Sequence, residues 1–202
     1  MKRSAGKKLM EQRILDAADR LFYGEGIRAV GVDPIAAEVG ISKRTLYNYF
    51  PSKDDLVVGY LARRLRPIAI SERPPAQQIL EDFDRLEAAF ADGGFRGCPF
   101  VNAVAELKEP GHAANKIALA FKDQRRAWFR ELLSRLPVAK PDQLAMQLLL
   151  LVDGAIAAAV VRKDPKMARV AQEAARVLLT AAGAIAAKPK RSAKRQPQRA
   201  GR

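Results

Sequence analysis

Apolar residues recur at helical spacing along most of the chain, and no segment requires a strand. The first clear stripe is formed by Ile14, Ala17, Ala18, Leu21 and Phe22, which follow the pattern of one buried helix face. It predicts a helix from about Leu9 to Tyr23 that ends at the glycines of the next turn.

The second half of the chain continues the same pattern. Further helices are predicted over Gln77–Ala91, over a short segment beginning at Cys98, and over Ala113–Leu136, Pro141–Arg162 and Asp164–Ile185. The faces of the last two are too widely apolar for one chain's core, which favours a four-helix interface with a second copy. We therefore expect an all-α protein that forms a homodimer.

The stretch Ile35–Phe50 has the pattern of two short helices joined by a tight turn. Gly40 accepts the positive φ of a sharp helix stop. Ser42 is a good N-cap for the second helix, in which Leu46 and Phe50 share a buried face. This arrangement is typical of a helix-turn-helix, whose second helix enters the DNA major groove.

The residues left outside the second helix suit DNA. Arg44 and Asn48 point away from Leu46; Arg pairs with the O6/N7 edge of guanine and Asn with the N6/N7 edge of adenine. A cation in the first helical turn is unfavourable with the helix dipole, and a nearby phosphate would compensate for it. The candidate phosphate contacts are Lys43, Thr45, Tyr47 and Tyr49. A plain helical hairpin with a solvated polar face is the alternative.

A fourth helix is predicted directly after this unit. Ser52 is placed to cap it, and Asp54 and Asp55 favour its N-terminus. Its far end carries a basic cluster, which we interpret as a solvated face or as partners of acids, formed by Arg63, Arg64 and Arg66.

The wording of these segments resembles a known family. ISKRTLYNYFPSKDDL is similar to the recognition-helix signature of the tetracycline-repressor (TetR) family of bacterial transcription regulators, and the similarity runs without a gap from about Glu11 to Tyr60. GCPFVNAVAEL, Gly97–Leu107, resembles the ligand-domain signature of one subgroup of that family.

The resemblance implies a division of labour along the chain. It implies a three-helix DNA-binding domain over 9–52 and a helical ligand-binding and dimerisation domain over 53–187. Composition adds a disordered basic arm over 1–8 and a disordered basic tail over 188–202. It makes Lys53 a phosphate contact and the last two helices the dimer interface. The expected partners are a palindromic DNA operator, a second copy and a small-molecule effector, with repression the usual outcome.

Two positions depart from the family pattern. By local rules Asp33 caps the first helix of the pair, but the resemblance places the cap at Gly31, where a hydroxyl residue is usual. A phosphate contact that this hydroxyl often makes is therefore missing. Some relatives carry a DNA-contacting basic residue at Asp33, and an acid there repels the DNA backbone.

Charge supports DNA binding only indirectly. The net charge is +14, but most of it lies in the segments Met1–Lys8 and Lys188–Arg202, so the segment between them is close to neutral. Both ends are expected to be disordered without DNA and to add phosphate affinity without reading bases.

The second domain has the material for an effector pocket. Pockets are mostly apolar with a few polar groups. The candidate lining residues are Phe83, Phe100, Asn102, Phe121, Trp128 and Asp153. For each aromatic side chain taken singly, a plain core is the favoured interpretation. A carboxylate buried within Leu148–Val160 needs a partner, water or the dimer axis, so structural pairing is favoured over ligand binding for Asp153.

Other chemistries find little support. The single cysteine, Cys98, excludes an internal disulfide and fits a reducing cytoplasm; its apolar neighbours favour an inert thiol over a redox switch. The one histidine, His112, is expected to be exposed, and no metal site is predicted. Leu144–Val161 is long and apolar, but Gln147 and Asp153 interrupt it, which favours a buried helix over a membrane span.

No catalytic constellation or cofactor motif is evident, so an enzyme is not expected. The alternative to a regulator is an architectural DNA-binding protein with little sequence preference and no effector.

Overall fold

The computed structural model describes residues 2–109 and 111–186, and these residues are helical with short connections. The helices are α1 (Lys2–Glu25), α2 (Val32–Val39), α3 (Lys43–Tyr47), α4 (Lys53–Arg64), α5 (Pro75–Phe90), α6 (Pro99–Leu107), α7 (Ala113–Ser134), α8 (Pro141–Arg162) and α9 (Met167–Ala181). The prediction of an all-α fold is confirmed. The basic tail expected over 188–202 lies outside the described residues.

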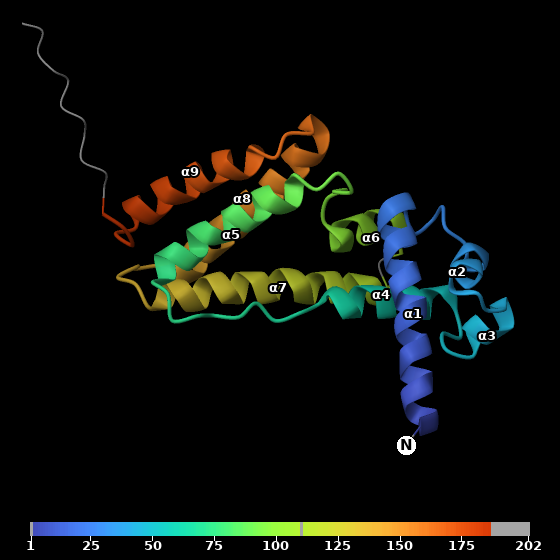
Figure 1. Ribbon diagram of the computed structural model, residues 1–202. Coiled ribbons are helices and arrows are strands. Elements are labelled where there is room, and N and C mark those ends of the chain that lie inside the picture. The colour runs from blue at the N-terminus through green and yellow to red at the C-terminus, as the bar shows by residue number, and fades with distance from the viewer. Residues whose placement is uncertain (1, 110, 187–202) are drawn as a thin grey trace, which may run out of the picture.

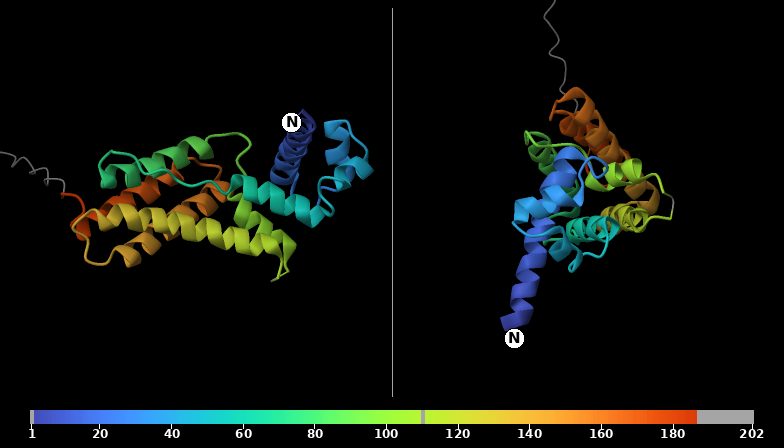
Figure 2. Two further views of the ribbon diagram at one scale, coloured as in Figure 1. Left: turned by 90° about the horizontal axis from the view of Figure 1, so that it is seen from below. Right: turned by 90° about the vertical axis from the view of Figure 1, so that its right-hand side faces the viewer.

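The helices form two groups at opposite ends of an elongated molecule. Helices α1, α2 and α3 lie at one end, where α1 crosses the end of the α4–α7 layer, and α5, α8 and α9 lie at the other (Figure 1). The long helix α7 runs through both groups, as the view from below also shows (Figure 2). The DNA-facing and effector-facing parts predicted from the sequence are thus physically joined by α4, α6 and α7.

Two hydrophobic cores correspond to these groups. The first contains the inward faces of α1–α4, such as Ile14, Leu46 and Leu56, and continues into α6 and the start of α7 through Phe100 and Ala118. The second is formed by α5, the later part of α7, α8 and α9. The first core therefore extends past the predicted domain boundary at residues 52 and 53.

Helix α1 begins earlier than the apolar stripe indicates. Lys2–Lys8 was expected to be disordered, and this expectation is wrong, because α1 is helical from Lys2. Lys, Ala, Met and Leu are good helix formers, so the helix continues beyond the part that packs on the core. Residues 5–9 are exposed, which explains why hydrophobic periodicity did not mark them.

Helix α3 is shorter than predicted. It ends at Tyr47, so Phe50 is not part of it, contrary to expectation. The Phe50 amide still donates to the Leu46 carbonyl at 3.0 Å, and its ring reaches the first core. The chain thus keeps the predicted packing with one turn less of regular helix.

Helix α8 is long and apolar enough to cross a membrane by length and composition. It packs instead between α7 and α9, with Leu144, Leu148 and Val152 in the second core. The prediction that this helix is a core element is confirmed.

Candidate nucleic-acid interface

The turn between α2 and α3 fixes how the two helices cross. Gly40 adopts φ 76°, ψ 36°, and its amide donates to the carbonyl of Ala37 at 3.0 Å. The Ile41 amide donates to the Ala36 carbonyl at 3.0 Å. Because most side chains are strained at this positive φ, glycine is the residue that lets α2 end and α3 begin so abruptly. The N-cap of α2 is Gly31, without a side-chain bond, as the resemblance implied.

Helix α3 is held by its cap and by one buried side chain. The Ser42 hydroxyl accepts from the Thr45 amide at 3.0 Å, and the two hydroxyl oxygens lie 2.8 Å apart. Leu46 is fully buried in the first core. The hydroxyl of Thr45, a predicted phosphate contact, therefore already has a partner within the protein. The cap and buried Leu46 together fix the direction of α3.

Apart from Lys43, which is exposed but paired with Asp33, three of the predicted DNA-binding side chains lie exposed on the outer face of this segment: Arg44, Tyr47 and Asn48. Arg44 and Asn48 are one helical turn apart, since the Asn48 amide donates to the Arg44 carbonyl at 3.2 Å. Among the ion pairs of the described residues, none involves Arg44. Arg44 thus combines exposure, a charge that is not neutralised within this part of the chain, and a fixed helix.

The other predicted contacts differ in their surroundings. Lys43 Nζ lies 3.0 Å from Asp33 Oδ2, and the hydrogen bond to this carboxylate raises the pKa of the lysine. Tyr49 is half-buried against the first core. Lys53 is half-buried at the start of α4, which Ser52 caps by accepting from the Asp55 amide at 3.0 Å. The sequence predicted a phosphate as the anion beside Lys43, and the structure places the Asp33 carboxylate there.

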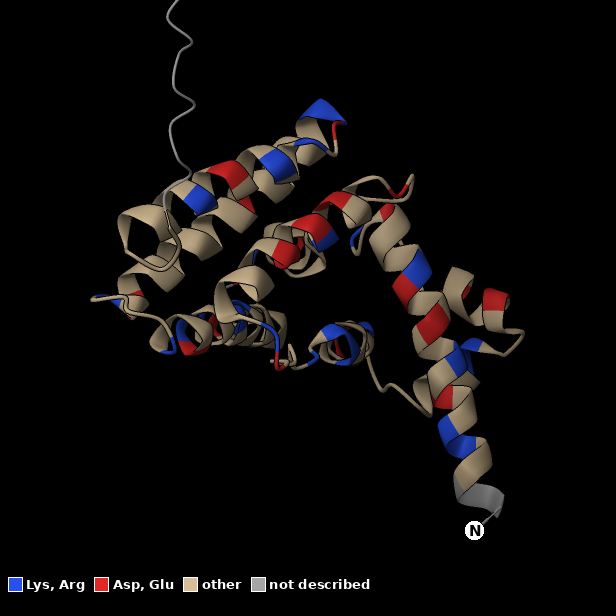
Figure 3. Ribbon diagram, turned by 60° about the vertical axis from the view of Figure 1, so that its left-hand side comes forward, with Lys and Arg blue, Asp and Glu red and all other residues tan. Residues whose placement is uncertain are grey.

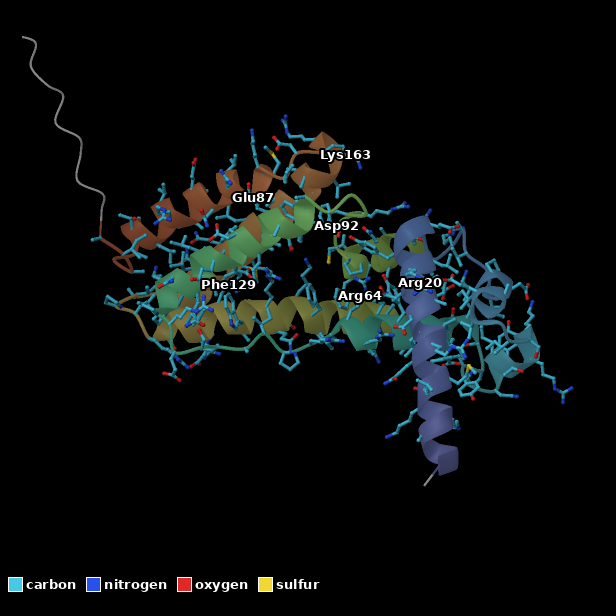
Figure 4. The ribbon with its side chains drawn as sticks, viewed as in Figure 1. Arg20, Arg64, Glu87, Asp92, Phe129 and Lys163 are labelled. Carbon is cyan, nitrogen blue, oxygen red and sulfur yellow. The ribbon has the colours of Figure 1, made fainter. Side chains whose placement is uncertain are left out.

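Polar contacts fix α2 and α4 against α1. Arg13 Nη2 donates to the Val39 carbonyl at 2.8 Å, and Arg20 pairs with Glu38. Arg64 pairs through two of its nitrogens with Asp19 and lies beside α1 (Figure 4). Acidic and basic residues accordingly alternate along α1 (Figure 3). The predicted interpretation of Arg63 and Arg64 as partners of acids is confirmed, with Asp16 and Asp19 as those acids.

Arg64 also lies over two aromatic rings. Its guanidinium is 4.8 Å from the centroid of Tyr23 and 5.3 Å from that of Tyr60. Burial raises the pKa of the Tyr60 phenol. The Tyr23 hydroxyl donates to the Gly97 carbonyl at 3.0 Å and accepts from the Arg96 amide at 2.9 Å, which joins α1 to the segment before α6.

The six predicted effector-site residues are not gathered in one place. Phe100 and Phe121 stack with centroids 4.1 Å apart, in the first core. Phe83 and Trp128 belong to the second core, where the indole nitrogen donates to the Ala69 carbonyl at 3.3 Å. Asn102 donates to the Arg96 carbonyl at 2.9 Å.

Asp153 pairs with Lys122, so the structural partner expected for this carboxylate is present. The Cys98 thiol is buried, in agreement with the inert alternative.

An open apolar groove of about 530 Å³ lies between α6 and α7. Its floor and rim include Val101 and Val104 from α6 and Ala118, Leu119 and Lys122 from α7. None of the six predicted effector residues is among its lining residues, although α6 and α7 also carry Phe100 and Phe121. The signal for this groove in the sequence was weak, because Val101, Val104 and Leu119 are ordinary positions in amphipathic helices.

His112 is not exposed, contrary to expectation. Its Nδ1 accepts from the Ala114 amide at 3.0 Å and thereby caps α7. This bond turns the ring inward, toward Asp54 at the start of α4, whose Oδ1 lies 3.6 Å from Nε2. The sequence did not predict this cap, because the neighbouring Gly111 indicated an exposed turn. Among the described residues no cluster of three or more metal-ligating side chains is present.

A family model and two solved structures match this chain, and all three are of the tetR family. Residues 14–59 match the family model of bacterial regulatory proteins of the tetR family. The crystal structure of a TetR-type transcriptional regulator from Streptomyces avermitilis is 33% identical, with a TM-score of 0.74; the match covers 87% of this chain and 99% of that one. A TetR-family regulator from Streptomyces coelicolor is 30% identical, with a TM-score of 0.76, over 86% of this chain and 96% of that one.

The curated relatives are more distant or matched only in part. An uncharacterized HTH-type transcriptional regulator of Mycobacterium tuberculosis is 35% identical over 79 residues, which is 39% of each chain. The HTH-type transcriptional regulator YjdC of Escherichia coli is 23% identical over 164 residues, 77% of this chain and 86% of that protein. The chain therefore matches about two-fifths of the length of the Mycobacterium tuberculosis relative.

Proposed function

Because the chain belongs to the TetR family of bacterial regulatory proteins, we propose that it binds a palindromic DNA operator as a homodimer and regulates transcription, with release by a small effector. The observation that carries the DNA-binding role is the surface of α3. There Arg44 is exposed and has no carboxylate partner among the described residues, on a helix whose direction is fixed by buried Leu46 and capping Ser42. A guanidinium held in this way is suited to the paired acceptors of guanine.

The homodimer is supported by an uncovered apolar surface on α8 and α9. Met146, Leu150 and Val161 on α8 and Val170 and Val177 on α9 are large apolar side chains that remain exposed in a single chain. Exposed apolar stripes on neighbouring helices favour burial against an identical pair, which gives the two-fold symmetry that a palindrome matches.

The effector proposal rests on the α6–α7 groove. Its size and mostly apolar lining suit a small apolar or aromatic molecule. Both helices also contribute to the first core, so a ligand that separates them changes the support of α4 and of the helix-turn-helix. Release requires that the ligand bind the DNA-free conformation more tightly than the DNA-bound one.

The test of DNA recognition begins by selecting the operator itself from random DNA. Full-length protein is used to enrich duplexes from a random library, and its affinities for the enriched duplex and for a scrambled duplex are compared at physiological salt. The proposal requires an enriched sequence with two related half-sites, bound on the order of 10³-fold more tightly than the scrambled one. Equal affinity for both would instead support the architectural alternative, in which the basic ends dominate.

The effector role has its own test. A compound that releases the enriched duplex from the wild type should lose its effect on Val104→Trp, which fills the α6–α7 groove, and keep it on Ala88→Trp, at an exposed position of α5 outside the groove and the proposed dimer surface. The same response in both variants would place the effector elsewhere.

A further inference from the structure

An acidic residue near the start of α2 lies beside the recognition helix α3. Asp33 is the second residue of α2 and Lys43 is the first residue of α3, and the carboxylate and ammonium are 3.0 Å apart. Their side chains are 66% and 52% exposed, so the pair lies in solvent, where DNA can reach it.

The Asp33–Lys43 ion pair adds little to the folding stability of the protein. Ion pairs between exposed side chains contribute little to folding, and salt screens them. The local electrostatics nevertheless explain why it forms. An acid near the start of α2 is favoured by the helix dipole, whereas a cation at the start of α3 is not, and the carboxylate compensates for this placement. The hydrogen bond to Asp33 also raises the pKa of Lys43.

Neighbouring charges show that this pairing is selective. Glu38, the other acid of α2, pairs with Arg20 of α1 and so supports the scaffold. Asp33 is the acid of α2 that contacts α3, and it contacts Lys43 rather than Arg44. Within the described part of the chain, two adjacent cations on the recognition helix are therefore in opposite states, one paired with an acid and one not.

We propose that Asp33 withholds Lys43 from DNA phosphates and so lowers the affinity of the recognition helix for DNA of any sequence. This inference rests on the proposed function, because it concerns the same DNA-facing surface. For Lys43 to contact a phosphate, its bond to Asp33 must break, and the carboxylate then faces the polyanion without a partner. The exchange yields little net attraction on any duplex. Affinity that does not depend on sequence is thereby lowered, for an operator and for random DNA alike.

The experiment measures the salt dependence of binding to a random duplex by full-length wild type and Asp33→Asn. Each phosphate contact adds about 0.9 to the slope of log affinity against log salt. Freed Lys43 should therefore steepen the slope by about 0.9 per subunit and raise affinity for random DNA roughly fivefold at low salt. Affinity for the selected duplex should rise no more than this, so that discrimination between the two does not increase.

Two further variants identify the cause. In a Lys43→Gln background, Asp33→Asn should leave the slope nearly unchanged, since no lysine is released. Glu38→Gln removes one negative charge from the same helix and should not reproduce the effect of Asp33→Asn. Thermal unfolding of all variants should remain close to that of the wild type, because the pair is exposed.

The outcomes separate this inference from the proposed function. An unchanged slope in Asp33→Asn would overturn the inference, as would an equal change in the Lys43→Gln background, which would make Asp33 a repelling charge acting by itself. A similar change in Glu38→Gln would also overturn it, in favour of net charge. Absence of any sequence preference in the wild type would overturn the proposed function, while the random-duplex slopes would still decide the role of Asp33.

Discussion

Residues of one charge type have different roles here because their partners differ. Arg44 and Lys43 are adjacent in sequence, yet within the described chain Lys43 is paired with an acid and Arg44 is not. Lys53 lies at the start of α4, half-buried, where the resemblance makes it a phosphate contact. Charged residues at the other end of the molecule differ in burial, and the pair of Asp82 and Arg125 is almost fully buried.

Removal of Arg44 and removal of Lys53 should change DNA binding in different ways. Arg44→Ala should weaken binding of the selected duplex by about 1–3 kcal/mol and relax preference at one base pair of each half-site, because a guanine contact is lost. Its affinity for random DNA should be nearly unchanged. Lys53→Ala should weaken selected and random duplexes by the same factor. Binding titrations on both duplexes check this, and equal scaling by both variants would make Arg44 a phosphate contact.

The pair of Asp82 on α5 and Arg125 on α7 should matter for folding. Their side chains are only 6% and 13% exposed. Asp82→Ala leaves a buried guanidinium without this partner and should destabilise the protein by roughly 3–5 kcal/mol. Glu131→Gln, which removes an exposed partner of Arg135, should cost less than about 0.5 kcal/mol. Urea unfolding of the two variants provides the comparison, and a similar small cost for both would mean that Arg125 finds water or another acid.

At the scale of elements, hydrophobic periodicity predicted the helices well where they pack on a core. The stripe from Ile14 to Phe22 located α1, and the Gly40 turn and the Ser42 and Ser52 caps followed from local chemistry. Periodicity carries no information where a helix leaves the core, which is why the start of α1 was missed. It also does not specify side-chain bonds between distant segments.

Side-chain bonds between distant segments account for the features of the candidate site that the sequence did not predict. Asp33 meets Lys43, and Arg64 meets Asp19, only after the helices have packed. The six candidate effector residues were chosen for chemical type, but they lie at different places along the helices. Phe83 is on α5, and Trp128 is about two turns beyond Phe121 on α7, so both belong to a different core from Phe100 and Phe121. Sequence thus predicted the elements and the recognition face, while the pairing of charges and the location of the groove depended on tertiary geometry.

Helix α6 should be held to the turn after α1 by a single carboxylate. Glu106 Oε2 accepts from the Arg28 amide at 3.0 Å. Glu106→Gln weakens a charge-assisted bond and should accelerate exchange of the Arg28 amide about fivefold, the equivalent of roughly 1 kcal/mol. Glu109→Gln, nearby after the end of α6, is the control and should not change it. Hydrogen exchange followed by NMR is the measurement, and an unaltered rate would show that other contacts hold this turn.

At the scale of the molecule, one chain leaves large apolar side chains exposed on two separate surfaces. One is the α8–α9 surface proposed as the dimer interface, and the other is the α6–α7 groove. Leu150 and Val177 on the first surface are 62% and 67% exposed, and Leu119 on the second is 63% exposed. Equal exposure with different proposed roles makes these residues a matched set.

A charge placed on the first surface should separate the subunits. Val177→Glu should give monomers at micromolar concentration and weaken binding of the selected duplex, because two half-sites are then bound independently. Leu119→Glu should remain dimeric. Sedimentation velocity distinguishes the two species, and a monomeric wild type would remove the basis of the dimer proposal.

The continuation of the first core into α6 and α7 has a consequence for how such regulators can be recombined. Phe100, Ala103 and Ala118 complete the packing around helices α1–α4. A fragment cut after α4 would expose that apolar surface to water and should be prone to aggregation. A chimera that transfers the DNA specificity of this protein to another effector domain therefore has to carry α6 and the start of α7 with it, or replace only the outward-facing side chains of α3.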